Sequence, residues 1–325
     1  MYAITGITGR VGGVVGRTLL SAGQRVRAVV RDADKGRLWC ELGCEVATAE
    51  MEDAAALTRA FANVTGVFIL PPSNFDPEPG FPEARAVISA VRQALDATRP
   101  TKVVCLSTVG AQAAQSNLLS QRTLMEEVLS RLPLPVTFLR PAWFMENLSW
   151  DVAQAREQGV LSCFLQPLDK PMPMVATADV GRVAAELLLQ DWSGKRVVEL
   201  EGPYWVTQNE IASELAKALH RPVRAEAVPR ESWGAIFRAQ GMRDPIPRIQ
   251  MLDGFNEGWI KFEGNGATLI KGNRSLLEVI QRILWVDPRR RYGRGRYRGR
   301  IRDSGRDDAS CSRCSRGFGQ AVGSI

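Results

Sequence analysis

The sequence predicts an α/β protein with a doubly wound parallel sheet and a smaller α/β C-terminal lobe. Three observations lead to this fold class. Short apolar, β-branched runs alternate with helical stretches, and a glycine-rich turn follows the first of these runs. After Pro141 the regular alternation of strand and helix patterns ends. Strands that alternate with helices of this length indicate βαβ units, whose right-handed crossovers cover both faces of a parallel sheet.

The elements of the first part, a domain expected over residues 1–145, follow one another in regular alternation. Strands are expected at Tyr2–Thr5, Arg25–Val30, Glu45–Thr48, Gly66–Leu70, Lys102–Ser107 and Val136–Leu139. The helices between them are expected at about 11–22, 34–42, 53–62, 81–98 and 118–131.

Residues 146–286 are expected to form the smaller lobe, which packs on the sheet beside a substrate cleft. Thr207-Gln-Asn-Glu210 has the sequence of a capping box and predicts a helix through Leu219, with His220, the single histidine, at its C-terminal cap. The other elements expected here are helices at Glu146–Gln158, Ala178–Gln190, after Pro229, after Pro245 and at Ser275–Trp285, and strands at Arg196–Leu200 and Val223–Val228.

Positive charge is concentrated at the end of the chain. The 325 residues contain 42 Lys+Arg and 35 Asp+Glu, but residues 287–325 hold 11 arginines and 4 acids, which leaves 31 of each sign before them. Residues 1–286 therefore have a net charge of zero, which is not typical of a nucleic-acid-binding domain. The run Arg289–Arg300 interleaves Arg, Gly and Tyr without apolar periodicity, so a disordered tail is expected over 287–325. Nucleic-acid binding is a hypothesis for this tail alone, and the plainer interpretation is an extension without a selected function.

Neither a membrane segment nor a metal site is expected. The sequence has no run near the ~18 consecutive apolar residues that a membrane span needs, and its first residues do not resemble a signal peptide, so a cytoplasmic protein is expected. Cys311-Ser-Arg-Cys314 supplies two ligands where structural zinc takes four. The six cysteines are therefore expected to be free thiols.

The turn Thr5-Gly6-Ile7-Thr8-Gly9-Arg10-Val11-Gly12 lies between the first strand and the first helix. In such a turn one glycine permits the tight bend, another lets the backbone approach a pyrophosphate, and a third lets helix and strand pack closely. The free N–H groups and the dipole of the helix then favour phosphate. The spacing G-x-x-G-x-x-G is the short-chain dehydrogenase variant of the Rossmann fingerprint and predicts dinucleotide binding.

The end of the second strand, Val29-Val30-Arg31-Asp32, bears on the choice of cofactor. An acid at this place binds the ribose hydroxyls of NAD, whereas an arginine accommodates the 2′-phosphate of NADP. Arg31 occupies the informative position, and Lys35 and Arg37 add positive charge nearby. NADP(H) is therefore favoured over NAD(H), with Asp32 as a ribose ligand left open.

Taken together, the chain resembles the NmrA-like family of atypical short-chain dehydrogenases/reductases, which includes NAD(P)H-dependent quinone reductases. The resemblance spans about residues 1–286. The segments that carry it are Thr5–Gly12, Val29–Asp32, Leu139–Asn147, Pro173–Gly181, Glu201–Pro203, Thr207 and Glu210–Ala212.

The resemblance implies a cofactor across the C-terminal ends of the strands. Gly6, Thr8, Gly9, Val11 and Gly12 would meet the pyrophosphate and Arg31 the 2′-phosphate. Leu70 and Pro71 would flank the ribose, and the residues near the nicotinamide would be Ser107, Thr108 and Pro141–Phe144. Arg122 would be a further cofactor-binding residue. The family's acid beside the adenine would have its counterpart in Glu50 or Met51.

The chain departs from the family's relatives at the catalytic dyad. Short-chain dehydrogenases use Tyr-x-x-x-Lys after the fifth strand, but here Arg122 takes the lysine position and Leu118 the tyrosine position. Leucine has no proton to give, so reduction of ordinary carbonyls by such a dyad is not expected.

Two interpretations remain. One is an oxidoreductase that passes hydride to a quinone-like or other small apolar acceptor, with Trp143, Phe144 and Met174 as an apolar wall and Arg122 or Ser107 stabilising the oxyanion. The other is a non-catalytic NADP(H) redox sensor that regulates a protein partner. The sequence identifies neither the acceptor nor the oligomeric state.

Overall fold

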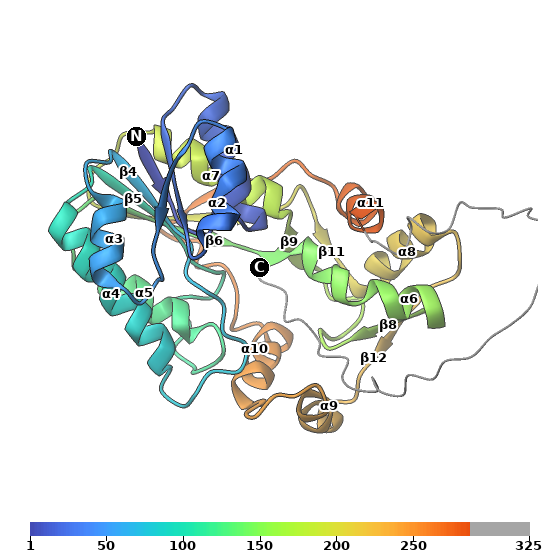
Figure 1. Ribbon diagram of the computed structural model, residues 1–325. Helices are drawn as coiled ribbons and strands as arrows, with labels where there is room; N and C mark the ends of the chain where they lie inside the picture. The colour runs from blue at the N-terminus through green and yellow to red at the C-terminus, as the bar shows by residue number, and fades with distance from the viewer. Residues whose placement is uncertain (287–325) are drawn as a thin grey trace, which may run out of the picture.

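The computed structural model describes residues 1–286 (Figure 1). Its centre is an eight-stranded sheet in the order β13-β10-β6-β5-β4-β1-β2-β3, in which every neighbouring pair is parallel. The strands are β1 (Tyr2–Ile4), β2 (Val26–Val30), β3 (Glu45–Thr48), β4 (Gly66–Ile69), β5 (Lys102–Leu106), β6 (Val136–Pro141), β10 (Lys195–Glu201) and β13 (Thr268–Lys271). The predicted fold class, a Rossmann-type α/β protein, is confirmed.

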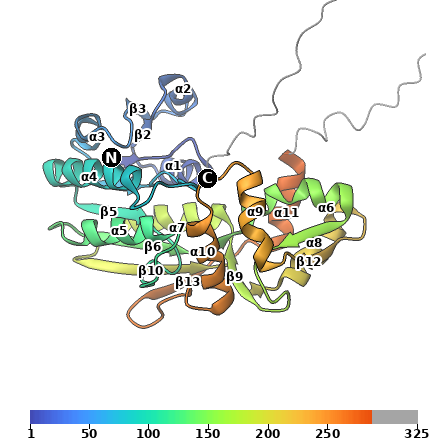
Figure 2. The same ribbon diagram turned by 90° about the horizontal axis from the view of Figure 1, so that it is seen from below.

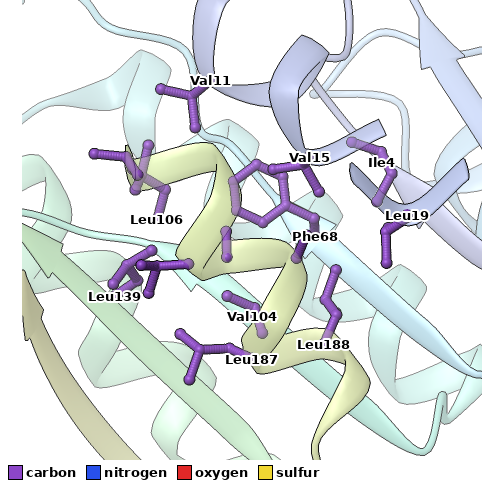
Figure 3. Packing of buried hydrophobic residues seen from close by; sticks show 14 of the residues in the cluster. Ile4, Val11, Val15, Leu19, Phe68, Val104, Leu106, Leu139, Leu187 and Leu188 are labelled. Atoms are coloured by element: carbon purple, nitrogen blue, oxygen red, sulfur yellow. The ribbon is translucent and has the colours of Figure 1, made fainter. Parts of the chain in front are cut away.

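Helices cover both faces of this sheet. The helices on one face are α1 (Arg10–Ser21), α2 (Ala33–Glu41) and α7 (Thr177–Leu189), and those on the other are α3 (Ala54–Phe61), α4 (Pro82–Thr98) and α5 (Ser120–Ser130). On the first face, Val15 and Leu19 of α1 and Leu187 and Leu188 of α7 pack onto Phe68 of β4, as Figure 3 shows. Their burial stabilises the sheet edge that carries the glycine turn.

The contact between α1 and α7 depends on a glycine. A Cβ on Gly181 of α7 would lie 2.7 Å from the carbonyl oxygen of Val11 and 2.5 Å from the Cβ of Val14. Only a residue without a side chain lets the two helices approach this closely. Because Val11 and Val14 belong to α1, this contact fixes the position of α7 relative to the helix that follows the glycine turn.

The lobe lies beside the sheet, with α6, α8 and α11 grouped around β8 and β12 (Figure 2). In one of its small sheets β9 lies between β11 and β7 and pairs with both, and in the other β12 pairs with β8. The elements are β7 (Trp143–Phe144), η1 (Met145–Trp150), α6 (Val152–Gln158), β8 (Val160–Cys163), β9 (Met172–Val175), β11 (Trp205–Val206), α8 (Gln208–Leu219), β12 (Arg224–Ala227), η2 (Arg230–Ser232), α9 (Trp233–Ala239), α10 (Ile246–Glu257) and α11 (Leu276–Val286).

Most predicted elements are present, with ends shifted by a few residues. The capping box at Thr207 and Glu210 is formed, and His220 caps α8 in the left-handed conformation at φ 54°. The single helix predicted over Glu146–Gln158 is wrong, because a 3₁₀ segment to Trp150 precedes α6. The short strands β7, β8, β9, β11 and β13 were not predicted.

The division into 1–145 and 146–286 remains a prediction. The main sheet takes β10 and β13 from beyond residue 145, and α7 from the same range covers one of its faces. The predicted tail and the Cys311/Cys314 pair lie outside the described residues. Among residues 1–286 no helix is both long and apolar enough to cross a membrane.

Candidate functional site

The predicted cofactor residues gather at the C-terminal edge of the main sheet. From β1 the chain proceeds to β2 on one side, whereas β4 lies on the other side of β1. Such a change of direction leaves a crevice outside the carboxyl ends of the strands, where α/β proteins bind ligands. The residues that follow these strand ends are Gly6–Gly12, Arg31, Leu70, Pro71, Ser107 and Thr108, and Pro141 ends β6.

The glycine turn is packed too tightly for side chains. Gly6 has φ +62°, a left-handed conformation that favours glycine. A Cβ on Gly12 would lie 2.3 Å from the carbonyl oxygen of Gly6. The first turn of α1 therefore sits directly on the bend that follows β1, as the spacing of the glycines predicts.

The N-terminus of α1 has the properties of an anion site. Gly9 is its N-cap residue, its first turn holds no acidic residue, and no side chain of the described chain caps it. The first N–H groups of a helix have no partner within the helix, and its dipole favours negative charge there. Thr8 is exposed beside this end, so its hydroxyl is accessible to a ligand.

Thr5 joins the two sides of the crevice. Its Oγ1 donates to the carbonyl oxygen of Phe68 at 3.1 Å and accepts from the backbone N–H of Leu70 at 2.8 Å. This bond places the Leu70 side chain against Gly6, where a Cβ would lie 3.2 Å from it. Leu70 is half-buried at the mouth of the crevice, and the following Pro71 is buried.

Arg31 and Asp32 differ in their partners. The Oδ1 of Asp32 accepts from the backbone N–H of Asp34 at 2.9 Å and thereby caps α2. Arg37 pairs with Asp34 at 2.9 Å. Arg31 is exposed, and within residues 1–286 its guanidinium has no hydrogen bond or ion pair. Arg31 and the exposed Lys35, whose side chain also has no partner within residues 1–286, are the cations left available to an anionic group.

After β3, the two candidate counterparts of the family's adenine-side acid differ in exposure. Glu50 is exposed and Met51 is 7% exposed. Only Glu50 carries the expected charge, so it is the one of the two that offers a carboxylate at this edge.

Ser107 begins a chain of buried polar groups. Its Oγ donates to Oε1 of Glu126 on α5. Glu126 also accepts two bonds from Arg140 of β6, at 2.9 and 2.6 Å. Burial alone would lower the pKa of Arg140, but its bonds to Glu126 and Glu263 hold that pKa above its ordinary value. Glu126 and Arg140 were missed because their partnership joins residues distant in sequence.

Arg122 holds the loop that follows β4. Its Nη2 lies 3.1 Å from the carbonyl oxygen of Pro71, 3.2 Å from that of Pro72 and 3.3 Å from Oγ of Ser73. Burial lowers the pKa of the half-buried guanidinium to about 10, which leaves it charged at neutral pH. Arg122 therefore shapes the cofactor edge from the lysine position of the dyad.

Leu118 lies outside α5, which begins at Ser120. Its backbone N–H donates to the carbonyl oxygen of Pro247 at 2.9 Å, and its side chain is buried among residues of α9 and α10. The described chain has no tyrosine on α5: Tyr2 is in β1 and Tyr204 precedes β11. The described chain therefore has no phenol at position 118, where the dyad would have its tyrosine.

The predicted apolar wall is only partly accessible. Trp143 is half-buried and packs edge-on against Phe255 of α10, with ring centroids 5.3 Å apart. Phe144 is also half-buried, whereas Met174 is 1% exposed within the core of the lobe. Phe255 was not predicted, because only the folding of α10 toward β7 brings it to Trp143.

Asp151, at the start of α6, is a further charged group that the sequence did not indicate. Burial raises the pKa of its carboxyl to about 7, and the positive charge of Arg248 on α10 opposes this shift in part. No salt bridge joins the two side chains within the described residues.

The glycine turn, the uncapped start of α1 and the crevice between β1 and β4 define a protein of the Rossmann-type, dinucleotide-binding α/β class. Comparison with known proteins narrows this class. The chain belongs to the NmrA-like family, whose model matches residues 2–258.

Two of the relatives that match most of the chain are an azoreductase and a quinone oxidoreductase. An NAD(P)H azoreductase from Xenophilus azovorans is 27% identical over 249 residues, which is 76% of this chain and 83% of the relative. Quinone oxidoreductase 2 from Escherichia coli is 26% identical over 249 residues, which is 76% of this chain and 84% of the relative. Both relatives are thus named for a reduction or oxidation reaction.

Solved structures share the fold. The NADPH-dependent quinone oxidoreductase from Escherichia coli in complex with NADPH superposes with a TM-score of 0.73 at 23% identity, over 87% of this chain and 100% of that chain. The triphenylmethane reductase of Citrobacter sp. in complex with NADP(H) gives 0.71 at 20% identity, over 87% and 99%.

Proposed function

We propose that this protein is an NADP(H)-dependent oxidoreductase that passes hydride to a quinone-like or other small apolar acceptor. The observation that carries the proposal is the uncapped N-terminus of α1 on the tight glycine turn, at the crevice between β1 and β4. The names of the relatives, an NAD(P)H azoreductase and a quinone oxidoreductase, support the same class of reaction.

The chain's part in the reaction is to bind and orient. NADPH, when bound, supplies the hydride. The N–H groups of Val11 and Gly12, with the Thr8 hydroxyl, would hold the pyrophosphate, because the N–H of Gly9 already donates to the carbonyl oxygen of Gly6 at 3.0 Å. The unpartnered Arg31 would hold the 2′-phosphate. The cap formed by Asp32 leaves it less suited to a ribose hydroxyl. This difference supports NADPH over NADH.

The acceptor class follows from what surrounds the nicotinamide end. Leu118 offers no proton, and the half-buried rings of Trp143 and Phe144 offer apolar contact. Quinones accept hydride with little acid catalysis, so such a site suits them. Ser107 and Arg122 make protein hydrogen bonds that favour shaping the site over stabilising an oxyanion directly.

The test is a calorimetric titration of the full chain with NADPH and with NADH, followed by NADPH oxidation with menadione as the acceptor. Arg31→Ala should weaken NADPH binding by about tenfold or more and leave NADH binding nearly unchanged. Arg37→Ala is the matched control, because Arg37 already pairs with Asp34. Absence of binding to either cofactor would overturn the proposal.

A second candidate is the non-catalytic sensor, which binds NADP(H) and regulates a protein partner. Leu118 in the tyrosine position favours it, since a sensor has no need of a proton donor. The two candidate functions differ in whether the protein oxidises bound NADPH. Tight NADPH binding without oxidation by menadione, benzoquinone or an azo dye would support the sensor.

A further inference from the structure

A chain of polar groups leads from the buried end of β5 to the exposed loop before β13. Ser107 donates its hydroxyl proton to Glu126, and Arg140 donates to both oxygens of Glu126, at 2.9 and 2.6 Å. Arg140 continues to Oε2 of Glu263 at 2.6 Å and to Oε1 of Gln112 at 3.1 Å. Ser107 is 6% exposed and Arg140 is 4% exposed.

The direction of the Ser107 bond follows from the charges. A guanidinium donates through all its N–H groups, and an ionised carboxylate only accepts. The bidentate contact with Arg140 favours Glu126 as a carboxylate, so Glu126 can only accept the hydrogen bond from Ser107. The Ser107 oxygen is left with lone pairs and no proton for any other group.

The place of Ser107 puts these lone pairs beside the proposed cofactor site. Ser107 directly follows β5, and its backbone N–H donates to the carbonyl oxygen of Leu139 at 2.7 Å, so it is fixed at the C-terminal edge of the sheet. A quinone oxygen offers no proton to such a group. The carboxamide of a nicotinamide offers an N–H donor.

We propose that Ser107 accepts a hydrogen bond from the carboxamide N–H of the nicotinamide, and that Glu126 and Arg140 are positioning residues that keep Ser107 in the accepting orientation. This inference rests on the proposed function and deepens it. The bond orients the carboxamide and thereby sets which face of the nicotinamide ring is turned toward the acceptor. It also gives the Glu126–Arg140 pair a role beyond linking α5 to β6.

The test compares NADPH with its reduced 3-acetylpyridine analogue, in which a methyl group replaces the amide nitrogen. Dissociation constants of both are measured by calorimetry on the full chain. The wild type should bind the analogue about five- to tenfold more weakly, as expected for one lost hydrogen bond. Ser107→Ala should bind both with nearly equal affinity.

Two further variants separate positioning from support of the fold. In Glu126→Gln the side-chain amide can donate to Ser107, so the hydroxyl proton of Ser107 no longer points at residue 126. The ratio of the dissociation constants of the analogue and of NADPH should then fall toward one. A merely structural role of Glu126 would weaken both ligands by one factor and preserve their ratio. Ser130→Ala is the control, because its hydroxyl bonds the carbonyl of Glu127 at the far end of α5.

The outcomes are distinct. If cofactor binds but Ser107→Ala keeps the wild-type ratio, or the wild type shows no preference, this inference is overturned and the proposed function stands. If the wild type binds neither ligand, the proposed function fails and this inference fails with it. Ser107→Ala removes one hydroxyl only, so the test holds even where Glu126→Gln does not fold.

Discussion

The hydroxyl of Thr5 accepts a 2.8 Å hydrogen bond from the backbone N–H of Leu70 and so joins the two strands that border the crevice. The same hydroxyl donates to the carbonyl oxygen of Phe68, so both of its functions are engaged. A side chain at the end of β1 thereby sets where β4 delivers the residues that flank the candidate cofactor site.

Replacement of Thr5 by valine keeps the shape of the side chain and removes both bonds. The N–H of Leu70 is left without its partner, so the free energy of unfolding should fall by about 1–3 kcal/mol. NADPH affinity should also fall, because Leu70 is no longer held. Urea unfolding and calorimetry measure the two effects, and Thr58→Val, which loses one bond to a helix carbonyl, is the control. Equal losses in both variants would contradict a special role of Thr5.

Replacement of Gly12 by alanine places a Cβ 2.3 Å from the carbonyl oxygen of Gly6, so the backbone has to move. We expect the free energy of unfolding to fall by about 1–3 kcal/mol and NADPH binding to be lost. Gly234→Ala in α9 is the control, since its nearest new neighbour is a flexible Arg238 side chain at 3.4 Å. That variant should be unchanged or up to about 1 kcal/mol more stable.

Replacement of Asp151 by asparagine tests the burial of a carboxyl whose pKa is raised from 3.8 to about 7. Because the pKa in the folded state exceeds that in the unfolded state, the ionised group destabilises the fold most above pH 7 and not at all below about pH 4. Asp151→Asn should therefore gain up to about 4 kcal/mol at pH 8, and the gain should shrink as the pH falls.

Urea unfolding of Asp151→Asn between pH 4 and 8 measures this dependence. Asp96→Asn, a change on the exposed side of α4, serves as its control. A gain that does not vary with pH would mean that Asp151 is hydrated in the folded protein.

Replacement of Trp143 by alanine removes the ring that packs on Phe255. If this ring contacts the acceptor, the KM for menadione should rise by about tenfold or more while NADPH affinity is retained. Trp285→Ala, at a residue 82% exposed on α11, is the control. Parallel loss of NADPH affinity and stability would instead assign Trp143 to packing between sheet and lobe.

The sequence predicts those parts of the fold that depend on local pattern. The alternation of strands and helices and the capping box at Thr207 are local, and so is the glycine spacing that positions α1. The strand β13 was missed because Thr268–Lys271 is short, lies between glycines and is largely exposed. Its pairing with β10 depends on the folded sheet.

The candidate site divides in the same way. Gly6, Arg31 and Ser107 could be placed because each follows a strand whose pattern is evident. The hydrogen-bonded network around Ser107 could not be placed, because in the sequence Arg140 is only a charged residue within an apolar strand. Its partners Glu126 and Glu263 come to it only in the folded protein. An ion pair between residues of different helices and strands leaves no pattern in the local sequence from which it could be predicted.

The origin of β10, β13 and α7 beyond residue 145 has a consequence for synthesis of the chain. When a ribosome has released only the first six strands, β6 is an unprotected edge and α1 has no α7 against it. The sheet becomes complete only after residue 271 has emerged, well after the residues that border the cofactor crevice have been made. Until then the nascent chain has an unpaired apolar edge strand, which is open to wrong pairing.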